Sequence, residues 1–292
     1  MKLIDGKEAA AKLQKTIAAE VAKMIDNDLK APHLVAILVG DEPASQTYVN
    51  AKEKASRAVG ITSSVYRLSE KTTENELLNL VDFLNQDEEV DGFIVQLPLP
   101  KHIQVERILN RIDYRKDVDG FHPMNIGKMV LGEEALLPAT PQGILYLLEY
   151  YKIETKGKNV VVLGRSNIVG TPISILLSRK AKLGDATVTL CHSRTENIAQ
   201  ITKSADIIIA AIGQAEFLKA DMVKEGVVVI DVGIHRIEDL KLEKGYRLIG
   251  DVDFKGVSKK ASFITPVPGG VGPMTIAALL KNTLLAAKKR GQ

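Results

Sequence analysis

The stretch that decides the fold is "GKNVVVLGRSNIVGTPISILL", residues 157–177. A short, continuously apolar run is typical of a parallel strand buried on both faces, and here it leads through a glycine-containing turn into a helix. A dinucleotide-binding domain holds the pyrophosphate of its cofactor at such a helix N-terminus. The usual G-x-G-x-x-G spacing is absent, because only Gly164 and Gly170 are present, with five residues between them. The loop alone therefore also fits an ordinary strand-to-helix connection.

The end of the next predicted strand indicates which cofactor this loop would hold. That strand, "ATVTLCH" at 186–192, is followed by Ser193 and Arg194, and it lacks the acidic residue that binds the ribose 2′-hydroxyl of NAD. A hydroxyl and a guanidinium suit a 2′-phosphate, which a carboxylate would repel. Arg165 adds a second cation in the first loop. A nicotinamide cofactor bound here is predicted to be NADP rather than NAD, and His192 is expected to be a surface residue at the strand end.

Strand-like and helix-like segments alternate along most of the chain. The other apolar strand candidates lie at 33–40, 61–68, 91–100, 206–213 and 226–233. This alternation predicts an α/β fold with two open parallel-sheet domains, the second Rossmann-like, and with a cleft between them. We expect residues 1–140 and a C-terminal helix at 272–292 to form one domain, and residues 141–271 to form the other. The segment 113–141 has little periodicity, which is typical of functional or interdomain segments.

Some helices have clear signals of their own. An apolar stripe from Leu13 to Met24 recurs at helical spacing and predicts an opening helix. Thr73 and Glu76 have the spacing of a capping box, which predicts a helix that begins after Thr73. The chain ends in a long apolar helical pattern after a Pro/Gly-rich stretch.

The composition argues against several classes of protein. With 292 residues, the chain is too long for one core of ordinary size, and two domains are expected. A net charge of +3, no Trp and only 4% aromatic residues argue against a nucleic-acid partner. The single cysteine, Cys191, permits neither an internal disulfide nor a Cys-rich metal site, and we expect it to be buried. No run of 18 apolar residues and no signal-peptide pattern occurs, so we expect a cytoplasmic protein without a membrane segment or a metal.

The helical stretch "YVNAKEKA" at 48–55 places a phenol and an amine together. Tyr48 and Lys52 are four residues apart and so lie on one face of a helix, whereas Lys54 points to another face. By itself this pair also fits a solvated helix surface. The same reservation holds for Asp117 as a charge on a loop surface and for Asp119 as a turn cap.

Taken together, the motifs resemble those of the FolD family of bifunctional methylenetetrahydrofolate dehydrogenases and methenyltetrahydrofolate cyclohydrolases. The resemblance covers nearly the full length. It rests on "YVNAKEKA", "VQLPLP" (95–100), "KDVDGFHPMNIG" (116–127), "PATPQG" (138–143), "GRSNIVGTP" (164–172), "VIDVGI" (229–234) and "TPVPGGVGPMT" (265–275). It implies oxidation of 5,10-methylenetetrahydrofolate by NADP+, followed by hydrolysis of the 5,10-methenyl product to 10-formyltetrahydrofolate. It also implies a homodimer.

The resemblance assigns roles to matching positions. Lys52 matches the catalytic lysine, Tyr48 its partner tyrosine, Gln96 the glutamine that contacts the lysine, and Asp119 the carboxylate that binds the pterin. An aminopterin edge offers two N–H donors to one carboxylate, which agrees with that last role. Further folate-binding positions are Leu97, Pro98, Pro266, Gly269 and Gly270. The cofactor-binding positions are Gly164, Arg165, Ser166, Gly170, Ser193, Arg194 and Ile234.

Two other functions compete with this interpretation. A shikimate-type dehydrogenase also pairs an α/β substrate domain with an NADP domain and uses a lysine. The segment "TPVPGGVGPMT" argues against it. A nucleotide sensor without catalysis could use the same fold, because a fold does not fix a function. The intact set of Tyr48, Lys52, Gln96 and Asp119 argues against a sensor.

Overall fold

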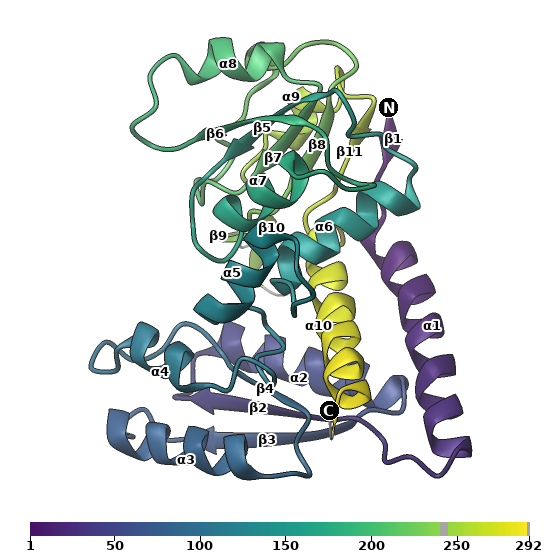
Figure 1. Cartoon of the computed structure of the whole chain (residues 1–292). Coiled ribbons are helices and arrows are strands. Elements are labelled where there is room, and N and C mark those ends of the chain that lie inside the picture. Colours follow the sequence, from purple (N-terminus) through teal and green to yellow (C-terminus); the bar gives the residue numbers. More distant parts are fainter. Residues whose placement is uncertain (240–244, 291–292) are drawn as a thin grey trace. The chain divides into compact units, whose positions relative to one another are not determined.

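The computed structural model describes residues 1–239 and 245–290 and divides into two compact units (Figure 1). One, the six-stranded unit, holds Met1–Ala10 and Thr140–Thr275, and the other, the three-stranded unit, holds Ala11–Ala139 and the chain from Ile276 onward. Helices α1 (Gly6–Asp26) and α10 (Val271–Lys288) have residues in both units.

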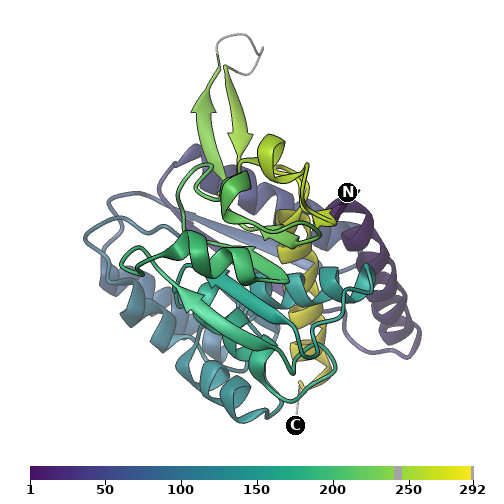
Figure 2. The same ribbon diagram turned by 90° about the horizontal axis from the view of Figure 1, so that it is seen from above.

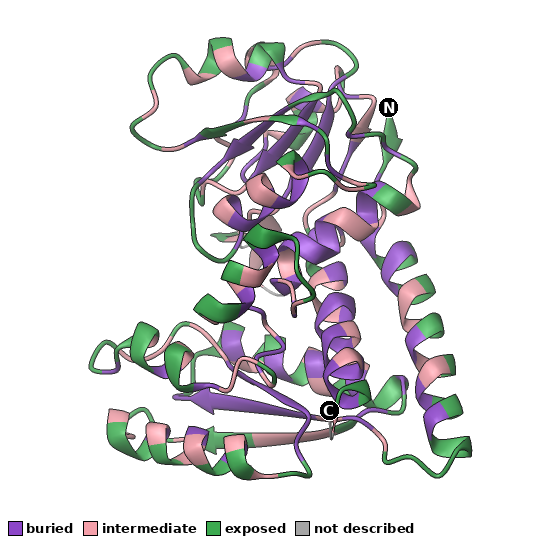
Figure 3. Ribbon diagram, viewed as in Figure 1, coloured by how far each residue is buried: buried purple, intermediate pink, exposed green. Residues whose placement is uncertain are grey.

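The six-stranded unit is built on a fully parallel sheet with the order β1-β11-β8-β7-β5-β6. Its strands are β1 (Lys2–Leu3), β5 (Asn159–Leu163), β6 (Thr187–Cys191), β7 (Ile207–Ala210), β8 (Val228–Asp231) and β11 (Phe263–Ile264). The central strands β7 and β8 are buried along their whole length, which explains their continuous apolar sequences (Figure 3). Strand order reverses at β5, since β6 pairs on one side of it and β7 on the other. The predicted Rossmann-like sheet is confirmed.

Short helices and one hairpin complete this unit. The helical elements are α6 (Ala139–Tyr150), α7 (Gly170–Ser178), α8 (Ile198–Ser204), η1 (Ala220–Met222) and α9 (Phe254–Val257). An antiparallel hairpin of β9 (His235–Glu238) and β10 (Tyr246–Ile249) projects from the main sheet (Figure 2). The guanidinium of Arg236 lies 3.8 Å from the ring centroid of Tyr246 on the facing strand. This hairpin was not predicted from the sequence.

The three-stranded unit has a parallel sheet of order β3-β2-β4. Its elements are β2 (His33–Val39), α2 (Pro43–Ala58), β3 (Thr62–Leu68), α3 (Glu74–Gln86), β4 (Gly92–Val95), α4 (Val105–Arg111) and α5 (Pro123–Leu131). The predicted capping box is confirmed, because Thr73 Oγ1 accepts from Glu76 N while Glu76 Oε2 accepts from Thr73 N. The predicted strand at 91–100 ends earlier than expected, at Val95.

The segment expected to be irregular contains a helix, α5. Pro123 occupies its first turn, His122 Nδ1 accepts from Met124 N at 3.0 Å, and Gly132 ends it at φ +76°. Residues 123–131 form only about two and a half turns, too short a window for a helical period to stand out. The low periodicity of 113–141 therefore does not mean that the whole segment is irregular.

Helices α1 and α10 contribute apolar faces to the cores. The stripe predicted for α1 is confirmed, with Ile17, Val21 and Met24 buried. In α10, Asn282 is fully buried, and its Nδ2 donates to the carbonyls of Val118 and Leu137, both at 2.8 Å. These two bonds tie the last helix to the loop that carries Asp119.

Candidate active site

Lys52 lies on the buried face of α2. The helix begins at Pro43, where the Glu42 carboxylate accepts from Ser45 N at 2.6 Å. Its buried residues recur every three or four positions: Ser45, Val49, Lys52 and Ser56. Only 8% of Lys52 is exposed, so its interpretation as a solvated helix residue is wrong, whereas Lys54 is exposed as expected. A lysine on a buried helix face requires a polar partner.

Gln96 supplies that partner from the end of β4. Lys52 Nζ donates to Gln96 Oε1 at 3.1 Å, across 44 positions of sequence. Gln96 Nε2 donates to its neighbour's carbonyl, that of Leu97, at 2.7 Å, and Gln96 N donates to Ile37 O at 2.9 Å. These bonds fix the side-chain amide so that its oxygen faces the lysine. The Leu97–Pro98 peptide that follows is cis.

Asp119 shares the electrostatic environment of Lys52. Burial raises the pKa of Asp119, and the charge of Lys52 partly offsets that rise. The backbone of Asp119 is held as well, since its carbonyl accepts from Ala139 N at 3.1 Å. Gly120 follows at φ +76°, and a Cβ there would lie 2.4 Å from the Leu137 carbonyl carbon. The structure therefore brings Lys52, Gln96 and Asp119 together within the three-stranded unit.

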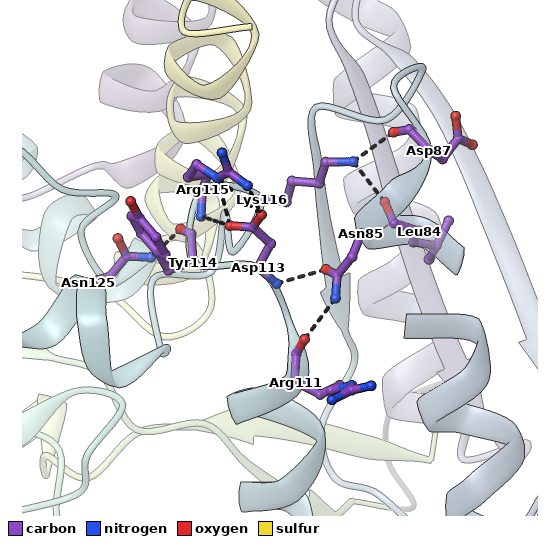
Figure 4. A network of polar contacts seen from close by, with 9 residues as sticks. All are labelled: Leu84, Asn85, Asp87, Arg111, Asp113, Tyr114, Arg115, Lys116 and Asn125. Carbon is purple, nitrogen blue, oxygen red and sulfur yellow. Dashed lines mark hydrogen bonds and ion pairs between the residues drawn. The ribbon is translucent and has the colours of Figure 1, made fainter. Parts of the chain in front are cut away.

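The chain that leads to Asp119 is anchored by polar contacts (Figure 4). Lys116 Nζ donates to the carbonyls of Leu84 and Asp87 at 2.9 and 2.7 Å. Asn85 accepts from Asp113 N and donates to the Arg111 carbonyl, both at 2.8 Å. Each of these four bonds involves a backbone atom, so they set the path of the loop itself.

Asp117 organises the loop from inside. Only 2% of Asp117 is exposed, so its interpretation as a surface charge is wrong. Its carboxylate accepts from Gly120 N at 3.2 Å, His122 N at 2.7 Å and Asn125 Nδ2 at 3.0 Å. Burial raises the pKa of Asp117, and the nearby charge of Asp119 adds to the rise. Sequence alone gave no sign that this carboxylate helps to shape the turn.

Tyr48 lies one helical turn before Lys52. The side chain is partly exposed, at 36%, and burial of the remainder raises the pKa of its hydroxyl. It can therefore cover a flat molecule placed over the lysine while keeping its proton at neutral pH.

The loop between β5 and α7 is closed tightly around its two glycines. Gly164 has φ +109°, and a Cβ there would lie 1.9 Å from Ala211 O. A Cβ on Gly170 would lie 1.8 Å from Gly164 O. Ser166 Oγ accepts from Val169 N at 3.2 Å and from Gly170 N at 3.4 Å. Two glycines therefore allow close backbone packing in this loop, where the usual dinucleotide-binding fingerprint uses three.

The predicted phosphate-binding cations emerge from neighbouring strand ends. Gly164 N donates to Cys191 O at 2.8 Å, which ties the first loop to the end of β6. A turn follows β6, closed by Thr195 N to His192 O at 2.8 Å. Ser193 and Arg194 at its tip are exposed, as is Arg165 in the first loop. His192 is half-buried at the strand end, and Cys191 is buried as predicted.

A pair of buried carboxylates that was not predicted from the sequence lies at the last residue of β8 and just after β10. Asp231 Oδ1 accepts from Gly233 N at 3.0 Å and from Asp251 N at 2.9 Å, and its Oδ2 accepts from Val252 N at 3.0 Å. Asp251 is 1% exposed and contacts His235 Nε2 through Oδ1 at 2.7 Å. The signal in the sequence was two aspartates, in "VIDVG" and "GDVD", the first directly after an apolar run and the second separated from Leu248 and Ile249 by one glycine. Ile234, a predicted cofactor contact, is 49% exposed beside this pair.

We expect the carboxylate pair to make stability depend on pH. Burial raises the pKa of Asp231 from 3.8 to about 7, and the charge of Asp251 adds to the rise. The pKa of Asp231 is therefore higher in the folded protein than in the unfolded chain. Its contribution to the free energy of unfolding is fully present at pH values below the unfolded pKa, and it is lost as the pH rises from there through about 7. The melting temperature of the wild type should therefore fall by several degrees more between about pH 5 and pH 8 than that of Asp231→Asn.

The comparison with Asp231→Asn removes the effect of other titrating groups. His33, whose pKa is lowered by burial, acts in the opposite direction, and it is present in both proteins. Parallel melting curves against pH for the two proteins would contradict the assignment.

The remaining predicted folate positions lie in the six-stranded unit. Gly269 has φ +103°, and its carbonyl accepts from Gly6 N at 2.9 Å. A Cβ on Gly270 would lie 2.6 Å from Pro266 O. Pro266, Gly269 and Gly270 thus form one compact turn before α10. Their place relative to Lys52 stays a prediction.

Within residues 1–239 and 245–290, no cluster of three or more His, Cys, Asp or Glu side chains could hold a metal ion. None of the helices in that part of the chain is long and apolar enough to span a membrane.

Comparison with known proteins identifies the family. Residues 4–119 match the catalytic domain of tetrahydrofolate dehydrogenase/cyclohydrolase, and residues 138–291 match its NAD(P)-binding domain. The bifunctional protein FolD of Flavobacterium johnsoniae is 61% identical over 99% of this chain and 98% of its own.

Solved structures agree with that match. The FolD enzyme of Campylobacter jejuni is 50% identical and has a TM-score of 0.92 over 99% of both chains. The Trypanosoma brucei enzyme, solved with NADP cofactor and inhibitor, is 40% identical with a TM-score of 0.93 over 98% of this chain and 97% of its own. The chain therefore belongs to the tetrahydrofolate dehydrogenase/cyclohydrolase family.

Proposed function

We propose that this protein oxidises 5,10-methylenetetrahydrofolate with NADP+ and hydrolyses the 5,10-methenyl product to 10-formyltetrahydrofolate. The observation that carries the proposal is a buried lysine held by an amide oxygen next to a carboxylate, Lys52 with Gln96 and Asp119. This constellation occurs in a chain that matches both domains of the family.

The hydrolytic step needs a base, and we assign it to Lys52. Water adds to the methenyl carbon, and Lys52 accepts one of its two protons. The remaining O–H then becomes the formyl C=O as the bond from the carbon to N5 breaks, and that second proton goes to N5. The substrate is a cation, and its charge disfavours a second positive charge on the amine beside it. Gln96 Oε1 keeps the amine in place, because it accepts from Nζ at 3.1 Å. Removing such a base costs about 10²–10⁴-fold in rate.

The carboxylate of Asp119 is assigned to substrate binding. An ionised carboxylate can accept two parallel N–H bonds from the aminopterin edge. Burial leaves the carboxyl of Asp119 poorly solvated, which raises its pKa. Its ionised form therefore gains from such N–H donors. Tyr48, partly exposed one turn from Lys52, is assigned to cover the pterin and orient the amine.

The oxidative step needs geometry rather than a protein acid or base. NADP+ supplies the acceptor for the hydride that leaves the methylene carbon. The chain's part is to hold that cofactor, and the tight loop from Gly164 to Gly170 fits a pyrophosphate at the start of α7. Arg165, Ser193 and Arg194 are exposed donors that fit the 2′-phosphate.

Replacing Arg165 with Ala should raise the KM for NADP+ about ten- to hundredfold and leave that for NAD+ nearly unchanged. The reason is that a hydrogen bond to a charged group is worth roughly 1.5–3 kcal/mol, and only NADP+ has the 2′-phosphate. Steady-state dehydrogenase assays with each cofactor measure the two values. Lys203→Ala, an exposed cation on α8, is the matched control and should change neither. An equal loss with both cofactors would remove Arg165 from the 2′-phosphate site.

The overall activity is tested by substrate choice. With 5,10-methylenetetrahydrofolate and NADP+, we expect NADPH and 10-formyltetrahydrofolate to form, whereas shikimate should give no NADPH. NADPH formed from shikimate alone would favour the rival dehydrogenase. A homodimer, which the family resemblance implies, and the cytoplasmic location expected from the sequence stay predictions, the first open to analytical ultracentrifugation.

A further inference from the structure

The buried carboxylates Asp231 and Asp251 bind backbone segments at two neighbouring strand ends. Asp251 Oδ2 accepts from Gly213 N at 2.8 Å, just beyond β7. Asp231 Oδ1 accepts from Gly233 N at 3.0 Å, just beyond β8. His235 Nε2 contacts the other oxygen of Asp251 at 2.7 Å, and we assign the proton to His235 because an ionised carboxylate only accepts.

These segments have little freedom to shift. A Cβ on Gly233 would lie 2.3 Å from Asp251 Oδ1, and a Cβ on Gly250 would lie 1.9 Å from Asp231 Oδ2. The two carboxylates are thus packed directly against backbone on both sides. A change in either one is expected to move the turns after β7 and β8.

The strand order indicates where Asp231 and Asp251 lie relative to a bound cofactor. In open parallel sheets, ligands bind beyond the carboxyl ends of the strands, where the strand order reverses. Here the reversal lies at β5, and the loops after β5 and β7 touch, because a Cβ on Gly164 would meet Ala211 O at 1.9 Å. If the adenosine 2′-phosphate lies over β6 with Ser193 and the pyrophosphate lies at α7, the nicotinamide half extends over β7 and β8. That is the edge held by the two carboxylates.

We propose that Asp231, Asp251 and His235 are positioning residues for hydride transfer, which hold Gly213 and the Gly233–Ile234 turn beneath the nicotinamide half of NADP+. The proposal rests on the proposed function. None of the three needs to touch the reacting atoms. A displacement of about 1 Å, even one caused far from the chemistry, can cost on the order of a hundredfold in rate.

The chemistry of the proposal predicts a selective defect. Hydride transfer depends on the cofactor's position, whereas hydrolysis of the methenyl compound uses Lys52 in the three-stranded unit. A variant that disturbs the carboxylate network should therefore impair the dehydrogenase and spare the cyclohydrolase.

The experiment compares His235→Phe, His235→Gln and Asp251→Asn in the full chain. Dehydrogenase kcat and KM for NADP+ are measured beside hydrolysis of preformed methenyltetrahydrofolate. His235→Phe, which leaves an oxygen of Asp251 unpaired, should lower dehydrogenase kcat/KM about tenfold or more, with hydrolysis within about twofold of wild type. His235→Gln retains an N–H donor and should recover most of the loss. Asp251→Asn should reproduce the defect and raise the KM for NADP+.

Two outcomes would overturn the proposal. One is a parallel loss of both activities in His235→Phe without recovery in His235→Gln, which indicates a role in general stability. The other is dehydrogenase activity unchanged in both His235→Phe and Asp251→Asn. A wild-type protein with no dehydrogenase activity would instead contradict the proposed function, so the two failures are distinguishable.

Discussion

Lys52→Met should abolish hydrolysis of 5,10-methenyltetrahydrofolate while leaving measurable oxidation of 5,10-methylenetetrahydrofolate. Methionine nearly keeps the length of the side chain and its packing on the buried face of α2, but it has no amine. Loss of a general base costs about 10²–10⁴-fold, so hydrolysis should fall to the background rate. The methenyl compound should then accumulate while NADPH is formed, and both species can be followed by absorbance in the same reaction.

Lys54→Met is the matched control, because Lys54 is on the same helix but exposed. It should hydrolyse the methenyl compound at the wild-type rate. Tyr48→Phe should have a smaller effect than Lys52→Met, since the ring survives and only the hydroxyl is lost. If Lys52→Met hydrolysed the methenyl compound at the wild-type rate, Lys52 would be excluded as the base. Its contact with Gln96 would then have only a structural role.

Gly164→Ala should have the opposite effect, a loss of the dehydrogenase with the cyclohydrolase retained. The backbone at Gly164 has φ +109°, which is strained for any residue with a Cβ, and the added methyl would overlap Ala211 O at 1.9 Å. The loop must shift to relieve that overlap, and the shift moves the backbone that holds the pyrophosphate. We expect dehydrogenase kcat/KM for NADP+ to fall at least about a hundredfold, as a displacement of roughly 1 Å can do.

The control for this variant is Gly127→Ala in α5. A Cβ there meets nothing within 4 Å, so the added methyl overlaps no neighbouring atom. We expect Gly127→Ala to leave both activities unchanged. Cyclohydrolase assays with preformed methenyltetrahydrofolate separate a cofactor defect from unfolding. Retention of full dehydrogenase activity in Gly164→Ala would mean that this loop does not hold the cofactor.

The parallel strands were the easiest elements to predict. Strands β2, β5, β7 and β8 are buried on both faces, and such burial leaves a continuous apolar run in the sequence. The two-residue strands β1 and β11 leave no such run, yet their pairing places the first residues of the chain in the six-stranded unit. The antiparallel hairpin β9–β10 was missed because β9 is largely exposed and neither strand has a fully buried residue, so no buried period marks them in the sequence.

The candidate site was only partly predictable. Gln96 and Lys52 were paired through the family resemblance, because 44 positions separate them and no local pattern links a strand end to a helix face. Asp117 was misread because burial of a carboxylate depends on backbone N–H groups that only the folded loop supplies. Asp231 and Asp251 were not predicted for the same reason. The N–H groups of Asp251 and Val252 that donate to Asp231 lie about twenty positions after it in the sequence.

The central claim is that one protein performs oxidation and then hydrolysis at the same carbon. It is tested most directly with methylene-dideuterated 5,10-methylenetetrahydrofolate and NADP+ in ¹⁸O-labelled water, with both products analysed by mass spectrometry. We predict one deuterium in each NADPH formed, and one deuterium and one solvent oxygen in the formyl group of each 10-formyltetrahydrofolate. NADPH without deuterium, or a formyl group without solvent oxygen, would contradict the account.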